Sequence, residues 1–410
     1  MKKILVVNAI LILSLTTSCQ SDWPSKTWAN AINLSSSLPS DATEISGLYW
    51  NQNTSRLYCV GDGGSFYLLQ LNKATNSFTL VTSATNIGAP EGITQVDNAS
   101  NEFYTIDENS YEIRKHTYDT NFANITKVKS WNLLHSPSPM VDTGNTGPEG
   151  ICFVPDSYLQ KIGFISSATG DVYTSKKGMG GLLFLAHQNG GYVWAFDVNP
   201  IENNDFLFVG KYKTNRSESC DLAFDNSTGL MYILHNLDDN YLEVTDLKTS
   251  VSGNVYTLTK QKEYNIPNPT SGSINIEGFA ISPKYPESES LGVWLCRDVT
   301  SSTEKADALR WFNPYTADGS NIQTAILNSK ADSNSKIFVR TTHNTLRIME
   351  QQPSSQQYSI EIASLDGKIQ YRNAKTILPL KLMLNKYQQG ISLIRICDNS
   401  KQVYTFKFVI

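Results

Sequence analysis

Pro90-Glu91-Gly92-Ile93 recurs as Pro148-Glu149-Gly150-Ile151, and this short stretch decides the fold. Variants of it open three more segments: Glu44-Ile45-Ser46-Gly47-Leu48, Cys220-Asp221-Leu222-Ala223-Phe224, which lacks the glycine, and Ile276-Glu277-Gly278-Phe279. The acids are 47, 58, 72 and 56 residues apart, so every interval is long enough for one four-stranded sheet. A loose repeat of this length indicates a repeat architecture.

Each interval repeats the same internal order. A short apolar strand follows the acid, then a polar turn, then a second apolar strand. We expect these second strands at residues 56–60, 102–106, 182–186, 230–234 and 292–296. A third strand with alternating apolar positions follows, most clearly at residues 192–198. Strands and turns at this spacing, almost without helical periodicity, predict the blades of a β-propeller.

We therefore expect an all-β protein whose main domain, residues 27–318, is a five-bladed β-propeller. Residues 27–34 have strand character and would supply the outermost strand of the last blade, which closes the ring. A sandwich of many short strands is the alternative, but it gives five strands no reason to begin alike. The glycine-rich run at residues 176–181 is interpreted as a flexible insertion loop in the longest unit.

Composition excludes several classes of protein. Of 410 residues, 40% are hydrophobic, which is enough for a large core and excludes wholesale disorder. Lys and Arg total 34 against 38 Asp and Glu, a net charge of -4, so we expect no nucleic-acid partner. Cysteines 59, 152, 220, 296 and 397 show neither a C-x-x-C nor a zinc spacing and are expected to be buried free thiols.

Residues 1–19 have the pattern of an export signal. Lys2 and Lys3 precede a mostly apolar run at residues 4–15, which is too short to span a membrane. The end of this segment, Thr16-Thr17-Ser18-Cys19, resembles a bacterial lipobox, although Thr16 replaces the common leucine. That resemblance implies a lipidated Cys19 as the only membrane anchor, and a soluble secretory signal is the alternative. Both place the protein outside the cytoplasm.

The strand openings also resemble a known family. The Glu44-x-Ser46-Gly47-Leu48 opening, followed by repeated acid-glycine strand starts, resembles the SdiA-regulated family of exported proteins with a phytase-like β-propeller. The resemblance covers about residues 27–316. It implies a fold, and it implies no settled catalytic activity.

The recurring acids form the first candidate site. The first strand of a blade lines the central channel, so these acids are expected to form a ring at one channel mouth. They are Glu44, Glu91, Glu149, Asp221 and Glu277. Three interpretations stay open: staples that accept backbone N–H groups of the next blade, ligands of a cation, or catalytic groups. Calcium is the one cofactor that the sequence suggests, because it takes six to eight oxygen ligands.

A second set of polar residues follows the second strands. Antiparallel second strands would end on the acid side, so both sets would share a face that could bind a ligand. The set is Asp62, Asp107, Glu108, His187, His235, Arg297 and Asp298, with the neighbouring Asn109, Gln188 and Asn236. The alternative is that polar residues simply belong at strand ends, where turns begin.

The C-terminal residues read as a separate domain. A polar linker at 319–335 precedes 336–410, in which short strands predict a small β-sandwich. Asp366-Gly367-Lys368, the stretch 390–396 and the stretch 405–409 resemble the sorting domain of type IX secretion cargo. The resemblance implies the secretion machinery as a partner, and the outer-membrane surface or the medium as the location. It fails at residues 340–344, which replace the usual P-N-P turn, and at Ser392. An ordinary accessory β-domain is the alternative.

Two classes of function follow. No G-x-S-x-G elbow, H-E-x-x-H, Walker loop or dinucleotide fingerprint is present, which favours a binding or scaffold module with a small-molecule or surface ligand. The alternative is a calcium-dependent hydrolase of phosphoric or carboxylic esters. Acids mixed with Lys or Arg at one mouth would favour the hydrolase, and an aromatic groove would favour binding.

Overall fold

The computed structural model describes most of the chain. The described residues are 21–40, 42, 44–119, 122, 124–285, 289–299, 301–316, 337–342, 345–350, 355–364, 368–383, 391–399 and 403–409. The predicted signal segment with Cys19, the linker at 319–335 and the Asp366-Gly367 turn lie outside these residues.

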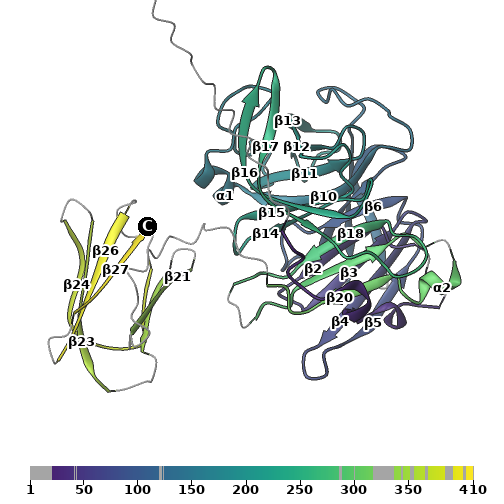
Figure 1. The fold of residues 1–410 in the computed structure, drawn as a ribbon. Helices are drawn as coiled ribbons and strands as arrows, with labels where there is room; N and C mark the ends of the chain where they lie inside the picture. The colour runs from purple at the N-terminus through teal and green to yellow at the C-terminus, as the bar shows by residue number, and fades with distance from the viewer. Residues whose placement is uncertain are drawn as a thin grey trace, which may run out of the picture.

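The first body is built from antiparallel groups of four strands, which we call units one to five (Figure 1). Unit one is β2 (Gly47–Asn51), β3 (Arg56–Gly61), β4 (Ser65–Asn72) and β5 (Ser77–Ala84). Unit two is β6 (Pro90–Thr94), β7 (Glu102–Asp107), β8 (Glu112–Tyr118) and β9 (Ile125–Asn132). Unit three is β10 (Pro148–Pro155), β11 (Gly181–His187), β12 (Tyr192–Val198) and β13 (Phe206–Lys213).

The remaining units complete the body. Unit four is β14 (Asp221–Asp225), β15 (Leu230–His235), β16 (Tyr241–Ser252) and β17 (Val255–Asn265). Unit five is β18 (Ile276–Ile281), β19 (Val293–Arg297), β20 (Leu309–Phe312) and, from the N-terminal segment, β1 (Ile32–Asn33). One parallel bridge, Lys213 with Thr257, joins units three and four into an eight-stranded sheet.

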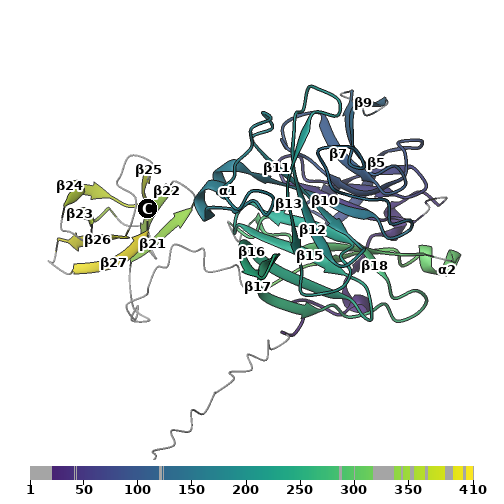
Figure 2. The ribbon, with the colours of Figure 1, turned by 90° about the horizontal axis from the view of Figure 1, so that it is seen from above.

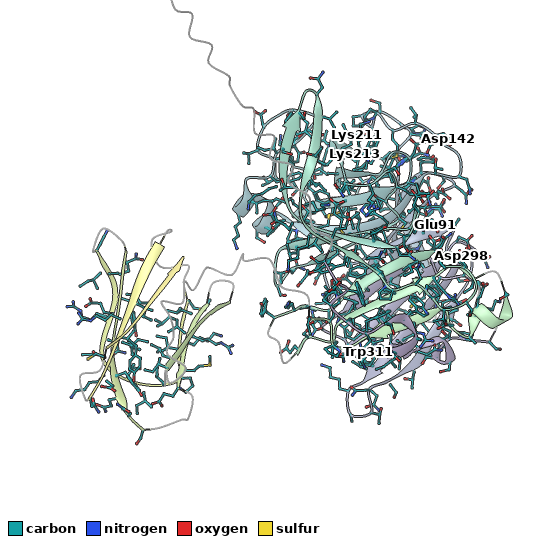
Figure 3. All side chains as sticks on the ribbon, viewed as in Figure 1. Glu91, Asp142, Lys211, Lys213, Asp298 and Trp311 are labelled. Atoms are coloured by element: carbon teal, nitrogen blue, oxygen red, sulfur yellow. The ribbon has the colours of Figure 1, made fainter. Side chains whose placement is uncertain are left out.

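The first strands of the units contact one another in a closed circle. β2 contacts β6, β6 contacts β10, β10 contacts β14, β14 contacts β18, and β18 contacts β2. Hydrophobic cores fill the spaces between neighbouring sheets, including the space between units five and one, where Trp50 and Trp294 stack at 4.5 Å. Trp311, labelled in Figure 3, stacks on Trp294 in that core at 6.0 Å. The chain is therefore all-β with a propeller-like fold.

The N-terminal segment completes unit five, as the strand character of residues 27–34 predicts. β1 pairs with β20, Ile32 opposite Trp311, and lies at the outer edge of the sheet. Short 3-10 helices, η1 (Trp28–Asn30) and η2 (Ser35–Ser37), flank it. Trp28 is fully buried and donates its indole N–H to Asp307 at 3.0 Å, so the segment is fixed by packing and by a hydrogen bond.

The insertion in unit three contains a helix that the sequence did not predict. It begins with helix α1 (Asp156–Ile162), which ends at Gly163 in the left-handed conformation with φ of 62°. Tyr158 of this helix donates to the Asp246 carbonyl of unit four at 3.0 Å, and Gly181 already belongs to β11. Residues 176–180 of the glycine-rich run have neither helix nor strand, so the flexibility of this loop stays a prediction. A second helix, α2 (Ser302–Lys305), precedes β20.

Two further sequence predictions are resolved here. Cys59, Cys152, Cys220 and Cys296 are buried free thiols, as expected, and Cys397 is free but partly exposed. Neither helix in the described part of the chain has the length and hydropathy of a membrane span.

The strands from residue 337 onward form a second group, coloured yellow-green to yellow in Figures 1 and 2. β21 (Ile337–Thr342), β22 (Thr345–Glu350) and β25 (Leu380–Met383) form one sheet. β24 (Ile369–Ile377), β23 (Gln357–Ser364), β26 (Ile391–Asp398) and β27 (Val403–Val409) form the other. Side chains of both sheets, among them Ile337, Ile348, Ile360 and Ile394, share one core that contains no residue of the first body.

Candidate functional site

The recurring acids gather where the innermost strands begin. Glu91 and Glu149 occupy the second positions of β6 and β10, Asp221 opens β14, and Glu277 is the second residue of β18. The charge of Glu44 raises the pKa of Glu277, and the charge of Glu277 raises the pKa of Glu91. These acids therefore lie near one another at one end of the circle of strands. We call Glu44, Glu91, Glu149, Asp221 and Glu277 the acid ring.

Unit one departs from the predicted alignment of acids. Gly47 lies opposite Val60, just as Gly92 lies opposite Ile106 and Gly278 opposite Cys296. The residue before the glycine is an acid in units two and five, but in unit one it is Ser46. Glu44 therefore reaches the ring from the segment before β2 and does not occupy the repeat position.

The glycine of the repeat allows the innermost strands to approach closely. A Cβ on Gly92 would lie 2.7 Å from the Glu149 carbonyl oxygen and 2.9 Å from the Gly150 Cα. A Cβ on Gly47 would lie 2.5 Å from the Glu91 carbonyl oxygen, and one on Gly150 would lie 2.5 Å from the Asp221 Cα. In each acid-glycine pair, the first residue thus supplies the carboxylate, and the second must be glycine because the next strand leaves no room for a side chain.

Three glutamates of units two and three converge at the ring. Carboxylate oxygens of Glu91, Glu108 and Glu149 all lie within 4.8 Å of one another. Glu108 follows β7 and also accepts the Gly147 N–H at 3.0 Å, so it is fixed to the loop that leads into β10. We call these three residues the glutamate triad.

Burial and repulsion between carboxylates raise the pKa values of two triad residues, Glu91 and Glu149. Burial, with smaller contributions from nearby carboxylates such as Glu108, raises the pKa of Glu91 to about 8, although a hydrogen bond from Ser46 opposes the shift. Burial, with the charges of Glu91 and Glu108, also holds the pKa of Glu149 well above its usual range. The ionised triad is therefore costly unless protons or a cation balance its charge.

A second acidic group lies where units five and one meet. Burial, together with the charges of Asp298 and Asp62, raises the pKa of Glu44 to about 7. Burial raises the pKa of Glu277 to about 8, with contributions from Glu44 and Asp298, while a hydrogen bond from Asn236 opposes the shift. Figure 3 labels Glu91 and Asp298, one from each acidic group.

Asp221 behaves as a backbone staple. Its carboxylate accepts the N–H of Leu222 at 2.7 Å and the N–H of Phe279, in the next unit, also at 2.7 Å. Burial still raises the pKa of Asp221, although both hydrogen bonds lower it. The staple interpretation therefore holds for this acid, whereas Glu91 and Glu277 receive hydrogen bonds from the side chains of Ser46 and Asn236.

The second predicted set divides into two groups. Asp62, Glu108 and Asp298 join the acid ring, because their charges act on ring acids. Asp107 does not: it pairs with Arg114 and accepts the N–H groups of Ala89 and Ser110, so it fixes a turn.

Arg297, His187 and His235 also fall outside the predicted ligand face. Arg297 is buried, and its guanidinium donates to the carbonyls of Ser271 and Ser273 at 2.6 and 2.9 Å. His235 is buried, donates Nδ1–H to the Glu218 carbonyl, and has Nε2 3.3 Å from Glu243. Burial lowers the pKa of His187 to about 4, so it is neutral near pH 7. Sequence position alone does not distinguish a strand-end residue that packs inward from one that faces the channel.

Two residues that contribute to the site were missed by the sequence analysis. Ser46 donates to Glu91, and the charge of Glu218 raises the pKa of Glu277. Aligning the repeat on its glycine, not on its acid, would have revealed Ser46. No repeat feature marks Glu218.

The chemistry that the ring can support follows from its charges. The strongest charge effects on Glu44, Glu91, Glu149 and Glu277 all come from other carboxyl groups. Carboxylate oxygens are ligands that calcium prefers, and the triad can supply up to six of them when each carboxylate is bidentate. The triad thus fits a hard cation.

Comparison with known proteins leaves the family open. No protein-family model matches the chain, and no curated protein is similar to it. A solved protein from Lactobacillus plantarum has 13% identity and a TM-score of 0.34, and the match covers 56% of this chain and 57% of that one, under two thirds of its length. Saccharomyces cerevisiae Sqt1 has 10% identity and a TM-score of 0.30 over 95% of this chain and 79% of its own.

A third solved structure corresponds in length to one small domain. It is a DUF3244 family protein with an immunoglobulin-like β-sandwich from Bacteroides vulgatus. It has 19% identity and a TM-score of 0.17, and the match covers 19% of this chain and 87% of that chain. Because the sequence identities and TM-scores are this low, the assignment of the fold rests on the sheets described above.

Proposed function

We propose that this chain is an exported binding protein, in which a five-bladed β-propeller holds a calcium ion at the glutamate triad. The five units, their closed circle of first strands and the cores between neighbouring sheets support the blade count. Two sheets around a shared core support a small C-terminal β-sandwich. The SdiA-regulated resemblance agrees with this architecture and remains part of the proposal.

The single observation that carries the cation is the triad itself. Three carboxylates from two units converge within 4.8 Å, and the neighbouring charges that affect them most are also negative. A divalent ion would remove this repulsion and would link unit two to unit three.

The residues around the ring favour binding over ester hydrolysis. The hydrolase alternative calls for basic side chains beside the acids, to engage an anionic substrate. Arg297, the basic residue predicted for this face, is occupied by backbone carbonyls. An aromatic pocket is present at the edge of unit three, which is the feature expected of a binding protein.

Export and surface location are proposed on sequence grounds. The segment 1–19 would direct export, with Cys19 as a lipid anchor, and residues 336–410 would address the protein to the outer-membrane surface or the medium through the type IX machinery.

Thermal unfolding with and without calcium tests the ion. Calcium at a hundred times its dissociation constant should stabilise the folded protein by about 2.7 kcal/mol, and chelator should reverse the gain. Glu149→Gln removes one ligand charge at nearly constant size and should weaken the response. Glu202→Gln, an exposed change outside the ring, is the matched control and should respond like the wild type.

An unfolding curve that neither calcium nor chelator moves would retire the calcium site. Equal responses of Glu149→Gln and wild type would show that calcium binds elsewhere.

A further inference from the structure

A pocket outside the acid ring lies at the outer edge of unit three. Its volume is about 270 Å³, and it forms where β12 and β13 meet the tip of the β16–β17 hairpin of unit four. Lys211, which lines this pocket, lies away from Glu91 and Asp298 in Figure 3. The pocket is therefore separate from the acid ring.

Four aromatic residues line the pocket. Tyr192 and Trp194 come from β12, Phe208 from β13 and Tyr256 from β17. The Trp194 and Phe208 rings are 5.5 Å apart at 52°, and Tyr256 packs edge to face on Tyr212. Packing on both sides thus holds these rings in place before any ligand arrives.

One ammonium group stands over this wall. Lys211 is paired with Trp194 across the sheet, and its Nζ is 4.7 Å from the centre of the Tyr192 ring and 5.3 Å from that of Trp194. The side chain is exposed and makes no ion pair within the described part of the chain. Lys213 differs, because its Nζ donates to backbone carbonyls, including that of Gly190 at 2.6 Å. Lys211 therefore carries the positive charge that remains available to a ligand.

The wall also contains a hydrogen-bond donor without an acceptor. Trp194 is 7% exposed, and its indole N–H has no partner among the described groups. This nitrogen is itself shielded from solvent, so a ligand in the pocket meets the face of the indole and not its N–H group. The exposed amide of Asn254, at the hairpin tip, adds polar capacity at the rim.

We infer that this pocket binds a hexuronate, a six-membered sugar ring that carries a carboxylate. The C–H faces of such a ring pack on aromatic side chains, its hydroxyls bond to the Asn254 amide at the rim, and its carboxylate pairs with Lys211. The volume lies just below the range of about 300–1,000 Å³ of pockets for drug-sized ligands, which limits the ligand to about one ring. The negative ligand complements Lys211, the lysine that lines the pocket.

Calorimetry on the full chain with glucuronate and galacturonate tests the inference. At least one of them should bind about tenfold more tightly than uncharged methyl glucoside, because one charge-assisted hydrogen bond contributes on that scale. Lys211→Gln should abolish this preference while leaving methyl glucoside binding unchanged. Tyr256→Ala should weaken both ligands alike, since it removes a packing surface. Lys73→Gln, another exposed lysine, is the matched control and should leave all affinities unchanged.

Three results would overturn the inference. The first is that neither hexuronate binds at millimolar concentration. The second is that wild type and Lys211→Gln bind the hexuronates with equal affinity. The third is that benzoate binds as tightly as the better hexuronate, which would indicate a site for aromatic acids. Glu149→Gln and chelator should not alter hexuronate affinity. This separates failure of the pocket from failure of the calcium site.

Discussion

The glycine that follows Glu91, Glu149 and Glu277 sets the distance between neighbouring innermost strands. At Gly92 the nearest atoms to an added Cβ are backbone atoms of the next unit, which cannot rotate away. The acid and the glycine are therefore both needed, the one for charge and the other for close packing.

Gly92→Ala should accordingly destabilise the protein by about 3 kcal/mol or more, at the upper end of overpacking effects. Gly144→Ala is the control: its Cβ would meet nothing within 4 Å, and only the strain of a φ of 64° remains, about 1–2 kcal/mol. Urea unfolding measures both. Equal losses would contradict the close-packing explanation.

The ring acids also predict a pH dependence of stability. At pH 7 folded Glu91 and Glu277, whose pKa values are about 8, hold protons that an unfolded glutamate with a pKa of 4.5 has released. Folding therefore takes up protons, and stability without calcium should fall as the pH rises from 7 to 9. The slope is about 1.4 kcal/mol per pH unit for each extra proton bound.

The pH range matters for this measurement. Burial lowers the pKa of His116 to about 3 and that of His187 to about 4, so both histidines oppose the trend below their unfolded pKa of 6.5. Above pH 7 both histidines are mostly neutral in the folded and the unfolded state, so they no longer affect how stability changes with pH. Thermal unfolding in chelator should show the fall, and Glu91→Gln should flatten it. A rise in stability between pH 7 and 9 would contradict the perturbed acids.

At the scale of elements, closure of the circle depends on the N-terminal segment. β1 has only two residues, so its two pairs with β20 contribute little alone. Trp28, just before it, is fully buried among side chains of units four and five, including Phe312 at 5.9 Å. The packing of Trp28 is thus the main contact that holds the N-terminal segment against unit five.

Trp28→Ala should lower the free energy of unfolding by about 3–5 kcal/mol, as expected for removing a buried Trp. Trp23→Ala removes a half-buried indole from the same region and should cost clearly less. Chemical denaturation followed by far-UV circular dichroism distinguishes them. Similar small losses would mean that β18 to β20 are stable without the N-terminal segment.

At the scale of the whole molecule, the two bodies have separate cores. The core around Ile348 and Ile394 contains no side chain from residues 21–316, and none of the inter-unit cores contains a residue beyond 316. Each body therefore has its own source of stability.

A chain that ends at Thr316 should unfold at the same temperature as the first body of the full chain, as scanning calorimetry would show. If residues 336–410 carry the sorting signal, the shortened protein should also remain in the periplasm. Loss of the first body's transition would contradict independent folding, and unchanged surface display would contradict the sorting proposal.

The sequence by itself determined the strands and their repetition. Alternation of apolar residues is a local signal, so the predicted second strands at 56–60 and 230–234 agree with β3 and β15 within one residue. The acid at the start of a strand likewise indicated which end of the unit it occupies. Helix α1 was missed, although Pro155 before it and Gly163 after it are ordinary boundary signals.

Only the tertiary structure decided which side chains meet. Glu108 and Glu149 are 41 positions apart and converge because units two and three pack side by side. Arg297 and Asp298 are neighbours in sequence, yet Arg297 bonds to backbone carbonyls and Asp298 acts on Glu44. Strand periodicity arises from backbone geometry within a few residues, whereas these contacts depend on how whole sheets are placed against each other.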